Sequence, residues 1–297
     1  MQTLRNQLTN SRFIHAIDTS AVYGSAAALP LLQIDAPFCR ATLLLQGAQL
    51  LQFQPATSAP WLWLSPYAQF ENGKSPRGGI PVCLPWFGVN RADPQKPKHG
   101  FARNRNWQLH DWQETDETVQ LTLTFDYAGD EPALFATSFI ATLVITLSTH
   151  LDMVLSIHNT STSAAEFSWA LHSYLAVDDC THTLVKGLQG ITYLDNTQGL
   201  KAVTSDTPVQ FTQEVDRVYN HTTAPQQLQS TQPLVIDGDH CPTCIVWNAG
   251  ETLAASMADI RDSYRGYVCI ERGCAFADSL TLQGGEVFRA EMRIRPG

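Results

Sequence analysis

The chain has 297 residues, 44% of them hydrophobic, which allows a substantial core in one large β domain or in two ordinary domains. We expect a single domain over residues 1–297, with residues 1–30 as a candidate peripheral N-terminal segment. The formal net charge of −9 argues against nucleic acid as a partner, because nucleic-acid binding usually requires a broad basic face.

The first residues, MQTLRNQLTNSRF, lack the basic and then apolar pattern of a signal peptide. No stretch of about 18 uninterrupted apolar residues follows them, so no membrane-spanning helix is expected. We therefore predict a soluble, cytoplasmic protein that does not associate with membranes, and we expect a monomer.

A cationic segment lies between Lys74 and Arg105. It holds seven of the 19 Lys and Arg residues of the chain, whereas Asp93 is its only acid. Within it, RGGIPVCLPWFG (77–88) and KHGFARN (98–104) combine glycines, which let backbone approach a ligand closely, with stiffening prolines and flat aromatic residues. One local cationic patch in an acidic protein favours a small anion over a polymer. We therefore predict a concave site for the phosphate or carboxylate of a metabolite.

Alternation of apolar and polar residues predicts strands in much of the sequence that follows. The pattern occurs at 119–125, 151–157 and 288–294, and is typical of half-buried strands. Residues 139–147, FIATLVITL, are apolar on both faces and predict a central strand that is covered on each side. No helical pattern of comparable length occurs.

Turn signals separate these segments at Asn72-Gly73, Asp237-Gly238 and Gly284-Gly285. Because alternating βαβ units are absent, a doubly wound nucleotide-binding fold is not expected. The predicted fold is all-β, a large antiparallel sandwich. The polar stretch 198–232 is predicted to form loops and edge strands over the rim.

His172 is a candidate proton carrier. If Phe167, Trp169 and Leu171 face the core, His172 emerges on the opposite face of the same strand, close to Tyr174. The unperturbed pKa of histidine, roughly 6.5, lies near working pH. The alternative interpretation is a structural histidine that is hydrogen-bonded within a polar sheet face.

Two carboxylates are candidates for chemistry. Glu271 ends the apolar segment YVCI and precedes a glycine by two residues, so it is predicted to stand at a sheet edge over a cleft, where burial would raise its pKa. Its alternative role is an ion pair with Arg272 or a solvated loop acid. Asp216 could instead form a surface ion pair with Arg217, and a glycosidase pair of Asp216 with Glu271 has no spacing rule to support it.

The seven cysteines, an odd number, are interpreted as reduced thiols without structural disulfides. Cys241-Pro242-Thr243-Cys244 is a CxxC motif that Cys269 and Cys274 could complete as a zinc site. The spacing of the second pair is wrong for a zinc ribbon. Buried structural thiols are therefore favoured over metal binding or redox chemistry.

Five segments occur in an order that resembles one enzyme family. The segments RGGIPVCLPWFG, KHGFARN, ALHSYLAV, EVDRVY and VCIERG are similar to those of the glucose-6-phosphate 1-epimerases, which belong to the aldose 1-epimerase and galactose mutarotase superfamily. The resemblance runs from about Leu31 to the C-terminus. It implies a large antiparallel β-supersandwich and a mutarotase that interconverts the α and β anomers of hexose 6-phosphates.

The resemblance also implies roles for six residues and no cofactor or metal. Arg77 and Arg103 would hold the sugar phosphate, which suits the paired donors of a guanidinium. His99 would contact the sugar, and Asp216 would accept hydrogen bonds from sugar hydroxyls or hold an arginine in place. His172 would be the catalytic acid and Glu271 the catalytic base.

One residue departs from the family pattern. The family often has proline after the catalytic glutamate, where this chain has Arg272, and a charge there is predicted to lower the pKa of Glu271. Two alternatives stay open. One is a non-catalytic sensor of carbohydrates or phosphosugars, and the other is an aldose 1-epimerase for unphosphorylated sugars.

Overall fold

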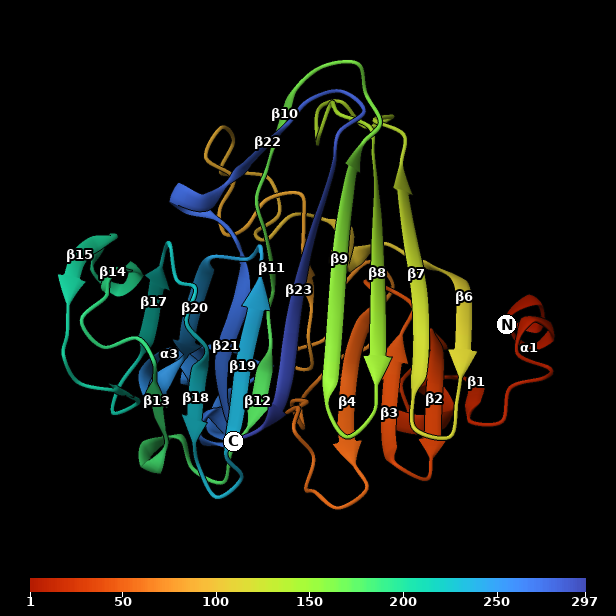
Figure 1. The fold of residues 1–297 in the computed structure, drawn as a ribbon, viewed down its shortest axis with the longest axis horizontal. Coiled ribbons are helices and arrows are strands. Elements are labelled where there is room, and N and C mark those ends of the chain that lie inside the picture. The colour runs from red at the N-terminus through yellow and green to blue at the C-terminus, as the bar shows by residue number, and fades with distance from the viewer.

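The computed structural model describes residues 1–297, and two large antiparallel sheets form its body (Figure 1). The first sheet has nine strands, which are, in spatial order, β16 (Val209–Gln210), β13 (Leu184–Lys186), β18 (Gln226–Gln229), β19 (Leu234–Asp239), β23 (Val287–Pro296), β9 (Leu151–Asn159), β8 (Phe139–Leu147), β7 (Val119–Tyr127) and β6 (Gln108–Glu114). The second has eight, which are β15 (Lys201–Thr204), β14 (Thr192–Asp195), β17 (Val215–Tyr219), β20 (Thr243–Asn248), β21 (Tyr267–Cys274), β11 (Trp169–Leu171), β5 (Val82–Cys83) and, paired with β21, β12 (Tyr174–Ala176).

Smaller elements complete the fold. A four-stranded sheet comprises β1 (Ile14–Asp18), β2 (Pro30–Ala36), β3 (Cys39–Leu44) and β4 (Gln49–Pro55), and a two-stranded sheet pairs β10 (Ala165–Phe167) with β22 (Leu280–Leu282). The α-helices are short, namely α1 (Gln2–Gln7), α2 (Thr19–Tyr23) and α3 (Gly250–Ser256). The 3₁₀ turns are η1 (Ala102–Asn104), η2 (Cys180–His182), η3 (Asn196–Gln198), η4 (Arg261–Gly266) and η5 (Phe276–Asp278). The predicted antiparallel sandwich is confirmed.

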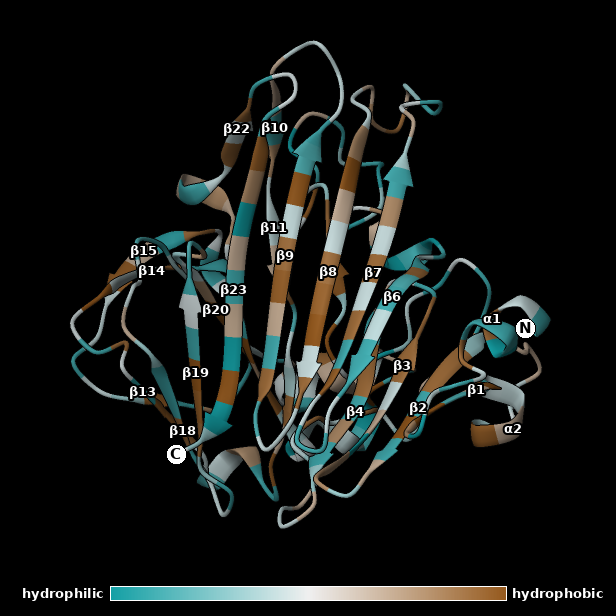
Figure 2. Ribbon diagram, turned by 45° about the vertical axis from the view of Figure 1, so that its right-hand side comes forward, coloured by the Kyte–Doolittle hydropathy of each residue, from teal (hydrophilic) through white to brown (hydrophobic).

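Period-two burial explains why β7, β8 and β9 pair side by side. In each strand every second residue is buried, and Figure 2 shows the resulting bands of hydrophobic and polar residues. One face of the sheet therefore covers the core while the other meets solvent. The prediction that residues 139–147 are covered on both sides is wrong. Ile140 and Val144 lie half-buried on the outer face, where branched side chains still favour the extended backbone.

The turn predictions hold at two of three sites. Gly73 and Gly285 occupy turns with φ angles of 77° and 80°, which glycine adopts at little cost. Asp237-Gly238 was wrongly predicted as a turn, because it lies inside β19 and pairs with β23. A Cβ atom at Gly238 would lie 2.3 Å from Cys241 Sγ and 3.0 Å from Arg272 Nε. Glycine is therefore needed there for close packing.

The polar stretch 198–232 is only partly peripheral. Its strands β15 and β16 are edge strands, as predicted, whereas β17 and β18 lie inside their sheets. The largest core cluster contains residues from Leu4 in α1 to Ile294 in β23. This continuity supports the proposal of a single domain, into which the N-terminal segment contributes buried residues.

Candidate active site

A cavity with a volume of about 1240 Å³ lies over the eight-stranded sheet. Its walls come from the cationic segment, from β17, β20 and β21, and from the chain around β11 and β12. All six residues that the sequence singles out line it, and they are Arg77, His99, Arg103, His172, Asp216 and Glu271. Segments that are far apart in the chain thus meet at one site.

Sheet register places His172 opposite Glu271. Leu171 pairs with Arg272 and Tyr174 pairs with Cys269, so the residues between them face each other across the two strands. The Nε2 atom of His172 lies 3.3 Å from Oε1 of Glu271. Glu271 is in the middle of β21, not at a sheet edge as predicted, and β21 is an interior strand of its sheet.

Burial controls the ionisation of this pair. His172 is 7% exposed and Glu271 only 1%. Desolvation, with a smaller contribution from Asp216, raises the pKa of Glu271 well above its usual value, although Arg103 opposes the shift. Desolvation, followed by His99, Arg103 and Arg77, lowers the pKa of His172 well below its usual value. Both shifts favour a pair that holds one proton in total.

Each member of the pair keeps an unused polar atom. His172 Nδ1 and Glu271 Oε2 are buried and have no hydrogen-bond partner. A buried polar atom without a partner is costly unless something else satisfies it. These atoms are therefore available to a ligand that enters the cavity.

His99 is held as a neutral imidazole beside the pair. Burial, then Arg103, Arg77 and Lys98, lowers the pKa of His99 to about 3. Its Nδ1 accepts a hydrogen bond from the Gly88 amide at 3.3 Å, which assigns the ring proton to Nε2. The ring lies 5.6 Å from that of His172, centroid to centroid.

The two arginines of the site are anchored differently. Arg77 donates from Nε to Asp259 Oδ2 at 3.0 Å and from Nη1 to the Tyr174 hydroxyl at 2.9 Å. Arg103 donates from Nη2 to the Lys98 carbonyl at 2.8 Å, while its buried Nε has no partner. Both therefore retain donors for an anion. Three further cations line the cavity, namely Lys74, Arg91 and Lys98.

Asp216 does not form the surface ion pair with Arg217 that the sequence left open. It accepts a hydrogen bond from Asn196 Nδ2 at 2.7 Å, and burial raises its pKa. The Arg217 guanidinium instead lies over the Tyr193 ring, 4.5 Å from its centroid. The carboxylate of Asp216 thus faces the cavity without an arginine partner.

Three residues around the acid–base pair were given no role in the site from the sequence, and of these only Tyr174 lines the cavity. Tyr174 stacks on His172 with centroids 4.7 Å apart and planes 8° apart. Its position two residues after His172 was the available signal, because alternate residues share a face. Asp259 gave no signal, since it lies in the loop between α3 and η4. Cys269, two residues before Glu271 on β21, was interpreted only as a structural thiol.

All seven cysteines are free and buried. One group of three metal-ligand side chains comes together, and it consists of His172, Cys269 and Glu271, with ligand atoms within 4.8 Å of one another. The CxxC cysteines Cys241 and Cys244 are not part of it.

Arg272 lies on the other face of β21 from Glu271. It is 1% exposed and donates to Gln226 Oε1 at 2.8 Å and to the Thr222 carbonyl at 2.9 Å. The prediction that its charge lowers the pKa of Glu271 is wrong, because successive residues of a strand point to opposite faces.

Replacement of Arg272 by alanine should therefore affect stability and leave the ionisation of the pair unchanged. We expect a loss of about 2 kcal/mol or more, since two buried acceptors lose their donor and a void remains. Urea denaturation measures the loss. The exposed Arg289→Ala variant is the control and should change stability by less than about 0.5 kcal/mol. A shifted pH profile of turnover in Arg272→Ala would contradict the assignment of Arg272 to the opposite face.

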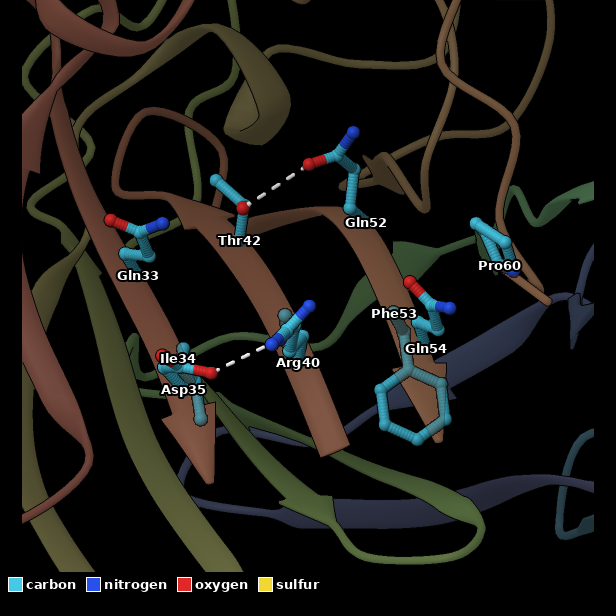
Figure 3. Close-up of a pocket in the computed structure, with 10 residues that line it drawn as sticks. Gln33, Ile34, Asp35, Arg40, Thr42, Gln52, Phe53, Gln54 and Pro60 are labelled. Carbon is cyan, nitrogen blue, oxygen red and sulfur yellow. Dashed lines mark hydrogen bonds and ion pairs between the residues drawn. The ribbon is translucent and has the colours of Figure 1, made fainter. Parts of the chain in front are cut away.

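A second pocket lies on the outer surface of the four-stranded sheet and has a volume of about 330 Å³ (Figure 3). Two pairs of its polar side chains are hydrogen-bonded to each other, Arg40 to Asp35 and Thr42 to Gln52. It contains no histidine or cysteine. The cavity at Glu271 is therefore the candidate active site.

No helix of the structure has the length and apolar character needed to cross a membrane.

The sequence profile of the aldose 1-epimerases matches residues 30–295. A protein of Escherichia coli K12 provisionally named glucose-6-phosphate 1-epimerase is 34% identical over 257 residues, which are 83% of this chain and 84% of that protein. A protein of the same provisional name from Cenchrus ciliaris is 31% identical over 272 residues, covering 86% and 81% of the two chains.

Solved structures of similar proteins have the same fold. A crystal structure from Salmonella typhimurium, provisionally described as a mutarotase, superposes with a TM-score of 0.86 at 27% identity, covering 96% of this chain and 94% of that one. A galactose mutarotase-like protein of Clostridium acetobutylicum superposes with a TM-score of 0.72 at 14% identity, covering 96% and 99%, and shares the fold.

Proposed function

Since the chain belongs to the aldose 1-epimerase family and is an isomerase, we propose that it interconverts the α and β anomers of glucose 6-phosphate and related hexose 6-phosphates. The observation that carries the proposal is the pairing of His172 with Glu271 at 3.3 Å in a cavity that Arg77 and Arg103 also line. The relatives provisionally named glucose-6-phosphate 1-epimerase support the substrate class.

The reaction requires one proton to leave the sugar and another to enter it. Glu271, as carboxylate, takes the proton of the anomeric hydroxyl, and His172, as imidazolium, gives a proton to the ring oxygen. The ring C1–O5 bond breaks and an aldehyde forms. Rotation about C1–C2 presents the other face of the carbonyl, and the reversed transfers close the ring as the opposite anomer. The pair starts and ends with one proton, so the cycle balances without an oxidant or reductant.

The low solvent exposure of the pair assists this chemistry. Burial by itself favours neutral Glu271 and neutral His172, which together carry the same single proton as the charged form. A hydroxyl that donates to Glu271 stabilises its carboxylate, while the developing charge on the ring oxygen favours imidazolium at His172. The raised basicity of Glu271 makes it a stronger base than a solvated glutamate.

Binding of the sugar is assigned to the remaining site residues. Arg77 and Arg103 hold the phosphate through the donors that their anchoring bonds leave free. Neutral His99 donates from Nε2 to a sugar oxygen, and Asp216 accepts from a hydroxyl. Phosphorylated hexoses occur inside cells, which supports a cytoplasmic location.

Exchange NMR between the α and β anomers tests the function. We expect the protein to accelerate exchange of glucose 6-phosphate more strongly than exchange of glucose. Binding of glucose 6-phosphate without accelerated exchange would make the protein a sensor. Equal acceleration of both sugars would make it an epimerase of unphosphorylated sugars, and either result would refute the proposal.

The pH dependence of kcat/KM should show a broad maximum. At low pH the pair gains a second proton and loses its base, and because the pKa of His172 is lowered, this acid limb lies below the ordinary histidine value of about 6.5. At high pH the pair loses its only proton, and the raised pKa of Glu271 moves this alkaline limb upward. Initial rates measured across pH at substrate concentrations well below KM give kcat/KM and therefore report both limbs. A half-maximal point near 6.5 on the acid side would contradict the one-proton pair.

A further inference from the structure

Three ligand-type side chains come together at the cavity wall: His172 and Glu271 line the cavity, and Cys269 lies behind them without lining it. The proposed reaction uses only His172 and Glu271. Cys269 and Glu271 are two residues apart on β21, so they share the face that looks into the site. His172 is opposite Glu271 across the strand pair. Their ligand atoms all lie within 4.8 Å of one another. Imidazole, thiolate and carboxylate are the ligands that Zn²⁺ takes in proteins.

The spacing of the acid and base fits a tetrahedral metal. Zinc binds nitrogen and oxygen at about 2.0–2.2 Å, so two such ligands on a tetrahedral ion lie roughly 3.3–3.5 Å apart. The observed distance from His172 Nε2 to Glu271 Oε1 is 3.3 Å. Sulfur at about 2.3 Å from the ion would lie roughly 3.6 Å from the other ligands, which movements of about 1 Å would provide.

The pair also has unsatisfied polar atoms. Both side chains are more than nine-tenths buried, at 9% and 1% exposure, and His172 Nδ1 and Glu271 Oε2 have no hydrogen-bond partner. These two atoms are not the ones whose spacing fits the ion, so they indicate only that each side chain has capacity for a further polar contact.

We propose that His172, Cys269 and Glu271 form an inhibitory site for a thiophilic divalent cation such as Zn²⁺. The ion would take one atom from each side chain and leave its fourth position toward the cavity, as in zinc sites with three protein ligands. Because the ion occupies the atoms that move protons, its binding would stop the reaction. The inhibitory effect rests on the proposed function, whereas the binding does not.

The charges of the site set limits on this binding. Arg77 and Arg103 act on the ionisation of the ligand residues and oppose a dication. The Cys269 thiol must also lose a proton, although burial raises its pKa. A thiolate and a carboxylate together neutralise Zn²⁺, and burial keeps His172 in the neutral form that a metal requires. The nearby guanidinium groups would favour an anion, such as chloride or phosphate, at the fourth position.

Direct metal titration of the full chain tests the site. We expect calorimetry to give one equivalent of Zn²⁺ for the wild-type protein, and Co²⁺ to give the near-ultraviolet charge-transfer band of a cobalt–thiolate bond. Cys269→Ala should bind Zn²⁺ about 100-fold more weakly and lack the band. Cys83→Ala, the same change at another buried cysteine, should retain both. Cys269→Ser, which keeps a side chain of similar size, replaces the alanine variant if that variant does not fold.

Turnover provides the second measurement. Zn²⁺ should inhibit the wild-type protein competitively with glucose 6-phosphate, a chelator should restore the rate, and Cys269→Ala should turn over normally and resist inhibition. Absence of stoichiometric Zn²⁺ binding, or equal affinity in Cys269→Ala, would overturn the site. If wild-type protein binds Zn²⁺ through Cys269 but does not interconvert anomers, the function fails and the metal site stands. If the wild-type protein interconverts anomers but does not bind Zn²⁺, the metal site fails and the proposed function stands.

Discussion

Glu271→Gln should lower kcat for anomer interconversion by about 10²- to 10⁴-fold, the range of a general base. The amide has the shape of the carboxylic acid and fits the same buried space on β21, but it cannot accept the proton of the anomeric hydroxyl. KM for glucose 6-phosphate should change little, because the phosphate contacts are intact. Exchange NMR at saturating substrate measures the loss, with circular dichroism to verify the fold.

The partner residue sharpens this prediction. His172→Gln should cause a loss in the same range, and the double variant should lose little more than either single variant, since acid and base act as one unit. Glu117→Gln, which changes an exposed turn residue, is the control and should retain full activity. Multiplicative losses in the double variant would show that the two residues do not act in one proton transfer cycle.

Arg103→Leu should lower kcat/KM for glucose 6-phosphate much more than it lowers turnover of free glucose, which loses only the effect of the Arg103 charge on the ionisation of His172 and Glu271. A hydrogen bond to a charged group contributes about 1.5–3 kcal/mol, so we expect a loss of about 10- to 150-fold. Arg103 is the sharper choice of the two arginines, because Arg77 also anchors Asp259 and Tyr174. Initial rates with both sugars, measured by polarimetry, give the comparison.

Two further variants define what Arg103 contributes. Arg103→Lys retains the charge but not the planar fork, so it should recover only part of the loss. Arg105→Leu is the matched control, because Arg105 belongs to the same cationic segment but forms an ion pair with Glu131 at 2.6 Å. An equal loss in Arg105→Leu, or an equal loss for free glucose in Arg103→Leu, would argue against a phosphate contact at Arg103.

The architecture could be predicted because strand alternation is a local property. Val119 to Phe125 alternate in the sequence and alternate in burial in β7, since a pleated strand must turn successive side chains to opposite faces. The same rule placed His172 opposite the core-facing Trp169 and Leu171. Alternation also holds at residues 139–147. The inference that failed there was the one from composition, because branched apolar residues stand on the outer face. Solvent exposure of an apolar residue is tolerated, so composition alone does not reveal coverage.

The sequence predicted which residues line the candidate site better than it predicted where they lie in the sheet and what surrounds them. The six singled-out residues line one cavity, yet Glu271 was expected at a sheet edge and Arg272 beside it. The first error comes from the position of β21 inside its sheet, which depends on β11, β12 and β20 pairing with it. The second comes from strand alternation, which turns Arg272 to the opposite face of β21. The contributions of Asp259 and Cys269 depend likewise on long-range packing, for which no local pattern exists.

The amino-acid pattern alone established an all-β sandwich, a local cationic segment and the residue types needed for acid–base chemistry and phosphate binding, because periodicity and charge are written along the chain. The folded molecule decided which of these side chains meet, how far Glu271 and His172 are removed from water, and that Arg272 faces away from them. Those features depend on strand register and on the burial that distant segments provide. The proton affinity of a buried side chain and its distance from another depend on which residues surround it in the folded protein, whereas periodicity depends only on the order of residues along the chain.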